Sequence, residues 1–160
     1  MRTIIIGLGN PVRSDDAVGL VVARLLRERL VDAGAADIQV TELPAGGLRL
    51  VEAMVGYDRA IVIDAMATGT RPPGSVRRLD LDELGQGHNL TCVHDTSLST
   101  ALAVWQGSDV AVPDDIAVWG IEGADLFTVG EDLSPPVDAA VPVAAQAILS
   151  ELGLSPRRAT

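Results

Sequence analysis

The sequence predicts a three-layer α/β fold built on a mostly parallel sheet. Two short apolar runs, TIIIGL at 3–8 and RAIVIDAM at 59–66, are continuously hydrophobic, as expected of strands buried on both faces. After the first run, apolar residues recur at three- and four-residue spacing with arginines between them, which is typical of an amphipathic helix. Strands that alternate with helices favour parallel βαβ units.

The first helix should begin at Ser14 or Asp15, run to about Asp32 and end before Gly34. The later elements are predicted as a strand at 37–43, a short helix at 48–55, the strand at 59–66, a strand at 75–81, a helix at 94–107, a strand at 115–123 and a helix from Pro135 to about Leu152. Pro142 lies inside the last helix, where a proline should cause a break or a kink.

Composition indicates one globular domain at 1–152, followed by a frayed tail at 153–160. No stretch approaches eighteen unbroken apolar residues, and glycine follows the N-terminus too soon for a signal peptide. We therefore expect a cytoplasmic protein that does not bind membranes. Cys92 is the single cysteine, which excludes an internal disulfide and a zinc knuckle.

The charge of the chain excludes several classes of function. The formal net charge is -10, and every basic residue is an arginine. Without lysine there can be no Walker A phosphate loop and no Schiff-base chemistry. The acidic balance and the scarcity of aromatic residues argue against a nucleic-acid partner.

The segment GLGNPVRSDDAVG at 7–19 joins the first strand to the first helix. A dinucleotide-binding loop would need a third glycine where Val12 stands, and two acids at the helix start would repel a pyrophosphate. Asp15 and Asp16 could each simply stabilise the helix N-terminus by about 0.3–1 kcal/mol. Since neighbouring helical residues point about 100° apart, we expect one aspartate to cap the helix and the other to face the cleft at the carboxyl ends of the strands. Asn10 should shape the turn.

Other candidate ligands are predicted at the same edge of the sheet. Asp64 ends an apolar strand, where a carboxylate needs a metal, a pairing partner or backbone hydrogen bonds. His94 opens a predicted helix and could serve as a ligand or as a structural residue, whereas His88 lies in a polar loop and is expected to be exposed. Two carboxylates with one imidazole suit a borderline divalent cation better than magnesium or calcium. The HExxH motif of common zinc peptidases is absent.

Over nearly its whole length the chain resembles the hydrogenase maturation endopeptidases, which trim a C-terminal extension from the large subunit of nickel-iron hydrogenase after nickel insertion. The resemblance is strongest in GLGNPVRSDDAVG, although Ala17 stands where many relatives have glycine. It extends to IVIDAM, HDTSLSTAL, GIEGADL and LSPPV. It implies a twisted, mainly parallel five-stranded sheet with helices on both faces, in which one strand can be antiparallel.

By this resemblance Asp16, Asp64 and His94 are the catalytic and nickel-contacting residues, and Asp15 is a helix-start or supporting acid. The partner is the nickel-loaded large-subunit precursor. Nickel arrives with that substrate, so no metal is expected to be tightly bound in the free enzyme. The metal either polarises the scissile carbonyl or activates water, or it serves as a recognition tether while an aspartate activates water.

Two alternatives stay open at this point. GLGNP also occurs near the start of peptidyl-tRNA hydrolases, but RSDDAVG and the negative charge depart from that family. The other alternative is a catalytically inert metal- or partner-binding module with the same fold. In either case, specificity is expected in the loops at 44–50, 66–74 and 82–93, which should surround the cleft.

Overall fold

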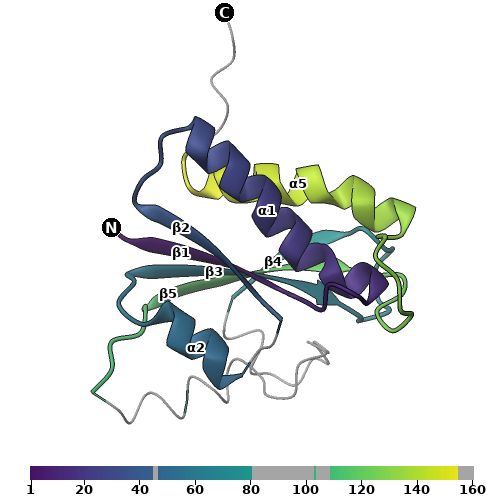
Figure 1. Cartoon of the computed structure of the whole chain (residues 1–160), viewed down its shortest axis with the longest axis horizontal. Helices are drawn as coiled ribbons and strands as arrows, with labels where there is room; N and C mark the ends of the chain where they lie inside the picture. The colour runs from purple at the N-terminus through teal and green to yellow at the C-terminus, as the bar shows by residue number, and fades with distance from the viewer. Residues whose placement is uncertain (45–46, 81–102, 104–108, 155–160) are drawn as a thin grey trace, which may run out of the picture.

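The computed structural model describes residues 1–44, 47–80, 103 and 109–154 (Figure 1). Its elements are β1 (Thr3–Leu8), the 3₁₀ helix η1 (Ser14–Ala17), α1 (Val18–Asp32), β2 (Ile38–Leu43), α2 (Leu48–Met54), β3 (Arg59–Met66), β4 (Val76–Asp80), β5 (Asp115–Glu122) and α5 (Pro135–Glu151). Strands and helices therefore alternate over most of the described chain, as the sequence predicted.

The strands form one five-stranded sheet in the order β2-β1-β3-β5-β4. The pairs β1 with β2, β1 with β3 and β3 with β5 are parallel, and β4 runs antiparallel to β5. In register, Gly7 of β1 lies opposite Ile63 of β3, and Asp64 lies opposite Gly120 of β5. The predicted sheet, with its one antiparallel strand, is confirmed.

Helices cover both faces of the sheet. Figure 1 shows α1 and α5 side by side on one face and α2 on the other. Side chains of β3 alternate between the two cores: Ile61 and Ile63 pack toward α1 and α5, whereas Val62 and Met66 pack toward α2. Burial on both faces explains why these strands are continuously apolar in sequence.

Glycines let α1 lie unusually close to the sheet. A Cβ atom on Gly19 would lie 2.3 Å from the carbonyl oxygen of Leu8 and 2.4 Å from that of Ile63. A Cβ atom on Gly7 would lie 2.4 Å from the carbonyl oxygen of Gly19. Two of the glycines in GLGNPVRSDDAVG thus serve helix–strand packing.

Two predictions about helices are corrected. The first helix begins as a 3₁₀ turn, because the backbone N–H groups of Ser14 and Asp15 bond outward to the carbonyl groups of Gly130 and Asp125 at 2.9 and 3.0 Å. In the last helix, Pro142 causes no break: α5 is continuous from Pro135 to Glu151. Pro142 lies on the exposed face, where water can satisfy the carbonyl group that its missing N–H would have bonded.

Some predictions concern residues that the structure does not describe. The helix predicted at 94–107 lies outside the described residues except for residue 103, which is helical. Most of the predicted tail, from 155 onward, also lies outside them. None of the described helices is both long enough and apolar enough to span a bilayer.

Candidate functional site

Buried carboxylates gather where the parallel strands end. Asp15, Asp16, Asp64 and Glu122 are all buried, and apart from Thr3 they are the buried polar side chains of the described ranges. They lie after β1, near the end of β3 and at the end of β5. In open α/β sheets, ligands bind outside the carboxyl ends of the strands. This acid edge (Asp15, Asp16, Asp64 and Glu122) is therefore the candidate site.

Asp16 is held against the end of β1 by the turn that follows the strand. Its Oδ2 accepts a hydrogen bond from the backbone N–H of Asn10 at 3.2 Å. Gly9 makes this approach possible: it has a φ of +151°, and a Cβ atom there would lie 2.1 Å from the carbonyl oxygen of Asp16. The Asn10 side chain accepts from the N–H of Val12 at 3.1 Å, which confirms its predicted role in shaping the turn.

Asp64 lies near the end of β3, at the same edge. Its Oδ1 accepts from the N–H of Ala65 at 2.8 Å. Because side chains alternate along a strand, Asp64 shares a face with Val62 and Met66, the face covered by α2. Gly19 contacts the carbonyl group of Ile63, so the start of α1 rests on β3 one residue before Asp64. The fold thereby brings the segment of Asp16 to the segment of Asp64.

Asp15 has a structural role that differs from the predicted one. We expected one aspartate to cap its own helix, but neither η1 nor α1 has a side-chain cap. The Oδ2 atom of Asp15 instead accepts from the N–H groups of Ala124 and Asp125 at 2.8 and 2.9 Å and from the hydroxyl group of Ser134 at 2.8 Å. Its Oδ1 accepts from the N–H of Ser134 at 2.7 Å. Asp15 therefore fastens the segment between β5 and α5 to the start of the first helix.

Glu122 is a buried acid that sequence reasoning did not select. Its Oε2 accepts from the hydroxyl group of Thr68 at 2.8 Å, and its Oε1 accepts from the N–H of Gly69 at 2.9 Å. Glu122 thus holds the loop that follows Asp64 along the chain. The signal was an acid at the end of an apolar strand, the same signal that identified Asp64.

The predicted histidine ligand, His94, lies outside the described residues, as does His88. Within the described ranges, no three His, Cys, Asp or Glu side chains are grouped so that they could hold a metal ion. Asp16 and Asp64 supply carboxylate oxygens, which suit a divalent cation once a nitrogen donor joins them. A buried carboxylate at a strand end can also act as a general base toward water.

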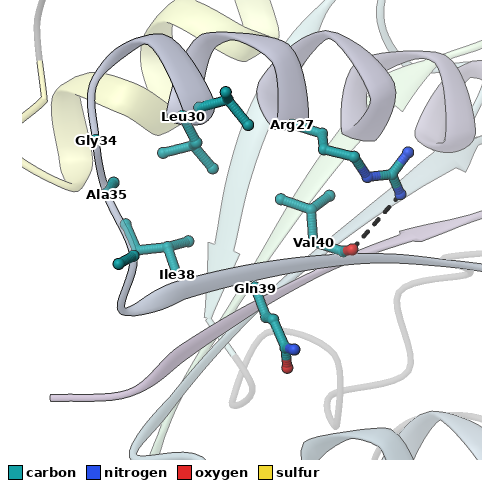
Figure 2. A pocket seen from close by; sticks show the side chains of 9 residues that line it. Arg27, Leu30, Gly34, Ala35, Ile38, Gln39 and Val40 are labelled. Atoms are coloured by element: carbon teal, nitrogen blue, oxygen red, sulfur yellow. Dashed lines mark hydrogen bonds between the residues drawn. The ribbon is translucent and has the colours of Figure 1, made fainter.

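The open hollow beside β2 is a different region. Its volume is about 410 Å³, and it lies between the end of α1 and the start of β2, with Leu30, Ile38 and Val40 in its lining (Figure 2). Arg27 closes one side, where its guanidinium group donates to the carbonyl oxygen of Val40 at 3.5 Å. This hollow is at the amino end of the sheet, so it does not include the acid edge.

Sequence comparisons find proteins that are similar to this chain. The family model described as "Hydrogenase maturation protease" matches residues 20–151, a range that includes Asp64 and His94 and begins after Asp16. The coenzyme F420 hydrogenase subunit delta of Methanothermobacter thermautotrophicus is 27% identical over 157 residues, covering 95% of each chain. The hydrogenase expression/formation protein HupM of Azotobacter chroococcum is 30% identical over 158 residues, covering 94% of this chain and 73% of HupM.

Structural comparisons agree with the observed architecture. The hydrogenase maturating endopeptidase HybD from E. coli superposes with a TM-score of 0.79 at 21% identity, covering 96% of this chain and 93% of HybD. The maturation protease HybD from Thermococcus kodakarensis gives a TM-score of 0.69 at 24% identity, covering 95% and 99%. At these identities the likeness establishes a shared fold.

Proposed function

The chain belongs to the hydrogenase maturation protease family, a family of hydrolases, and from this premise we propose that it removes the C-terminal extension of a nickel-loaded large-subunit precursor. The observation that carries the proposal is the burial of Asp16 and Asp64 together at the carboxyl ends of β1 and β3. Family membership decides against the peptidyl-tRNA hydrolase alternative.

Asp16, Asp64 and His94 are proposed to contact the nickel ion that the substrate carries. In the precursor the metal already has ligands of its own, so the protease needs only to complete its coordination. Two oxygens and one nitrogen suit nickel, which imidazole and carboxylate side chains bind readily. The nickel ion is thus part of the substrate, and the protease recognises whether it has been loaded.

Peptide hydrolysis at this site requires a water molecule, a base and a proton for the leaving amine. In one form of the mechanism, the substrate's nickel polarises the scissile carbonyl or lowers the pKa of the attacking water, and a carboxylate removes the proton. In the other form, nickel only fixes the position of the precursor, and an aspartate activates the water alone. In both forms the proton taken from water passes to the amine of the released peptide.

The test is mass spectrometry of the large-subunit precursor from the same organism after incubation with this protein, with and without nickel. We expect loss of a C-terminal peptide only from the nickel-loaded precursor. Cleavage of both forms would show that nickel is not the signal. Cleavage of neither would favour the inert binding module.

A pair of histidine variants tests the choice of nitrogen donor. His94→Ala should abolish cleavage and leave the melting curve unchanged, because a lost ligand removes the substrate's nickel contact. His88→Ala is the matched control and should cleave the precursor at the normal rate. An inactive, folded His88→Ala protein would reverse the assignment of the two histidines.

A further inference from the structure

Exposed apolar side chains lie on two segments next to Asp15, the turn before the first helix and the segment after β5. Val12 is 49% exposed, Phe127 is 68% exposed and Val129 is 79% exposed. Phe127 is the single phenylalanine of the chain, yet the protein does not bury it. Single exposed apolar residues are ordinary, whereas a group of them beside a candidate site marks an interaction surface. We refer to Val12, Phe127 and Val129 as the apolar patch.

Backbone hydrogen bonds bring the two halves of the apolar patch together. The N–H of Gly130 donates to the carbonyl oxygen of Val12 at 3.0 Å, and the N–H of Ser14 donates to that of Gly130 at 2.9 Å. The Ser14 hydroxyl group also donates to the carbonyl oxygen of Asp132 at 3.1 Å. Val12 and Val129 therefore lie next to each other although they are far apart in sequence. In Figure 1 the segment between β5 and α5 lies beside the start of α1.

The segment that carries Phe127 is held in place without a partner. The Oδ1 atom of Asp125 accepts from the N–H groups of Phe127 and Thr128 at 3.0 and 2.9 Å. Hydrogen bonds from Thr128, together with the one from Phe127, lower the pKa of Asp125, which keeps this carboxylate ionised as an acceptor. The Asp15 carboxylate also accepts from the backbone N–H groups of Ala124 and Asp125, just before Phe127. Because the backbone of this segment is already ordered, a partner that binds to it loses little free energy to ordering the segment.

The apolar patch is continuous with the candidate site. The N–H of Val12 donates to the side chain of Asn10, and the N–H of Asn10 donates to Asp16. One short turn thus presents an exposed apolar side chain at one end and a buried candidate catalytic carboxylate at the other.

We propose that the apolar patch is the surface on which the large-subunit precursor docks, which holds its C-terminal extension over Asp16 and Asp64. This inference rests on the proposed function. The segment 123–134 contains three acidic residues, Asp125, Glu131 and Asp132, and no basic ones, whereas Arg13 beside Val12 adds one positive charge, so the surroundings of the patch are net negative. The matching surface of the precursor is therefore apolar with basic residues around it, since opposite charges steer association and exclude other partners.

The experiment measures binding separately from cleavage. The Asp16→Asn protein, which should not turn the substrate over, is titrated with the nickel-loaded precursor, and the Kd is compared with that of the same protein carrying Phe127→Ser and Val129→Ser. We expect the Kd to rise at least about tenfold, as for the loss of an aromatic anchor. The control carries Val31→Ser and Val143→Ser, two exposed valines remote from the acid edge, and should bind within about twofold of the parent.

Equal affinity of the patch variant and the control would overturn the proposal, and so would the absence of any binding by the parent protein. Cleavage by the protein with an intact Asp16 is followed in parallel. Binding that depends on the patch without any cleavage would refute the proposed function and leave the docking surface standing. If the patch variant with an intact Asp16 cleaves the precursor as efficiently as the parent, the proposed function stands and the docking surface is refuted.

A charge-reversal variant tests the acidic surroundings of the patch. Glu131→Arg with Asp132→Arg should slow association with the precursor several-fold at low salt, and the difference should shrink as salt is added. The exposed side chains of these residues make no contact on which the fold depends among the described residues. An unchanged association rate would overturn the assignment of a basic rim to the partner.

Discussion

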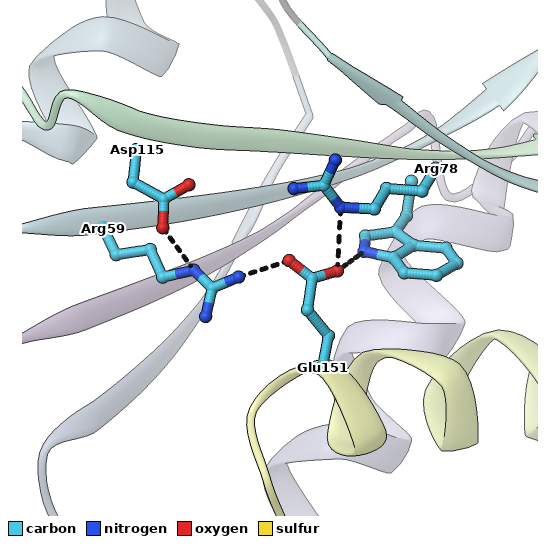
Figure 3. A network of polar contacts seen from close by, with 5 residues as sticks. Arg59, Arg78, Asp115 and Glu151 are labelled. Carbon is cyan, nitrogen blue, oxygen red and sulfur yellow. Dashed lines mark hydrogen bonds and ion pairs between the residues drawn. The ribbon is translucent and has the colours of Figure 1, made fainter.

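The two ends of the sheet hold their acidic side chains in different ways. At the carboxyl end, Asp15 and Glu122 are bound by N–H and hydroxyl groups. At the amino end, Glu151 of α5 accepts from Arg59, from Arg78 at 3.2 Å and from the indole N–H of Trp119 at 2.9 Å (Figure 3). Arg59 also pairs with Asp115 at 3.0 Å.

The difference concerns what happens to charge. An arginine neutralises the carboxylate that it binds, whereas N–H and hydroxyl donors hold a carboxylate and leave its negative charge in place. The amino end therefore locks α5 to β3, β4 and β5 with a nearly neutral network. At the carboxyl end, the donors that hold Asp15 and Glu122 are uncharged and do not neutralise the negative charge of a carboxylate, and electrostatic interactions are strong in a buried setting. Under the proposed function, that charge attracts the nickel carried by the precursor.

The largest effect is expected from removing charge at the carboxyl end. Asp16→Asn or Asp64→Asn should reduce cleavage of the nickel-loaded precursor by about 10²–10⁴-fold or more, because the amide can neither act as a base nor bind the cation as strongly. The melting temperature should change little, because asparagine has nearly the same shape and its side-chain oxygen can still accept from the backbone N–H of Asn10 or Ala65. The measurements are a cleavage time course and a thermal melt. Normal cleavage by both variants would show that Asp16 and Asp64 are structural. The carboxyl end of the sheet would then have no catalytic role that distinguishes it from the amino end.

Asp15→Ala should be the most destabilising change. It leaves the N–H groups of Ala124, Asp125 and Ser134 without their acceptor, at a cost of about 3 kcal/mol or more in the free energy of unfolding, measured by urea denaturation. Asp15→Asn keeps one acceptor oxygen and should lose less. A stable but inactive Asp15→Ala protein would instead assign Asp15 to the chemistry.

At the amino end, Glu151→Ala should cost about 2–3 kcal/mol, because Arg59 is largely buried and loses one of its two acidic partners. Cleavage by the folded fraction should not change, since this network packs on the α5 face of the sheet, whereas the Asp64 side chain lies on the opposite face. Glu151→Gln is the control for lost packing, and a urea titration of the three proteins gives the comparison. Loss of cleavage in folded Glu151→Ala would show that the two ends are coupled.

The smallest effect is expected at Glu42, which two arginines contact near solvent. Burial raises the pKa of this carboxyl, but hydrogen bonds from Arg24 and Arg27 outweigh that effect and lower it. A carboxyl with a lowered pKa stabilises the fold above its unfolded pKa, and this contribution is lost as the pH falls through the folded value. Because both arginines are well exposed, the contribution should be only about 0.5 kcal/mol.

The Glu42 prediction is checked by urea denaturation of the parent and of Glu42→Gln at neutral pH and at about pH 3, below the ordinary range of a glutamate. The difference between the two proteins should shrink at the acidic pH and also in high salt. A difference that persists in acid would mean that packing, and not charge, is what Glu42 contributes.

Much of the fold could be predicted because its signals are local. Continuous apolar runs identified β1 and β3, and the spacing of apolar residues identified α1. The predicted break at Pro142 is wrong because the cost of a proline depends on whether water can reach the freed carbonyl group, which only the packing of α5 decides. The 3₁₀ start of the first helix was missed because its N–H groups bond to a segment more than a hundred residues away.

In the candidate site, too, features with a local sequence signal could be predicted and features set by distant contacts could not. The position of Asp64 could be predicted from its own strand, and Glu122 carried the same signal although it was not selected. The partners of Asp15 could not be predicted, because Ala124 and Ser134 meet it only after the sheet has formed. The role of His94 stays a prediction that the histidine variants test.

The four hydrogen bonds of Asp15 have a consequence for the order of events during synthesis. Asp15 leaves the ribosome early, but its acceptor atoms have all their donors only when residues 124–134 have emerged. The strand β5, which lies in the sheet between β3 and β4, emerges shortly before. A nascent chain that lacks β5 and the segment up to Ser134 contains Asp15, Asp16 and Asp64 but not the backbone that holds Asp15 in position. The acid edge therefore assembles late, so a truncated protease should have no cleavage activity.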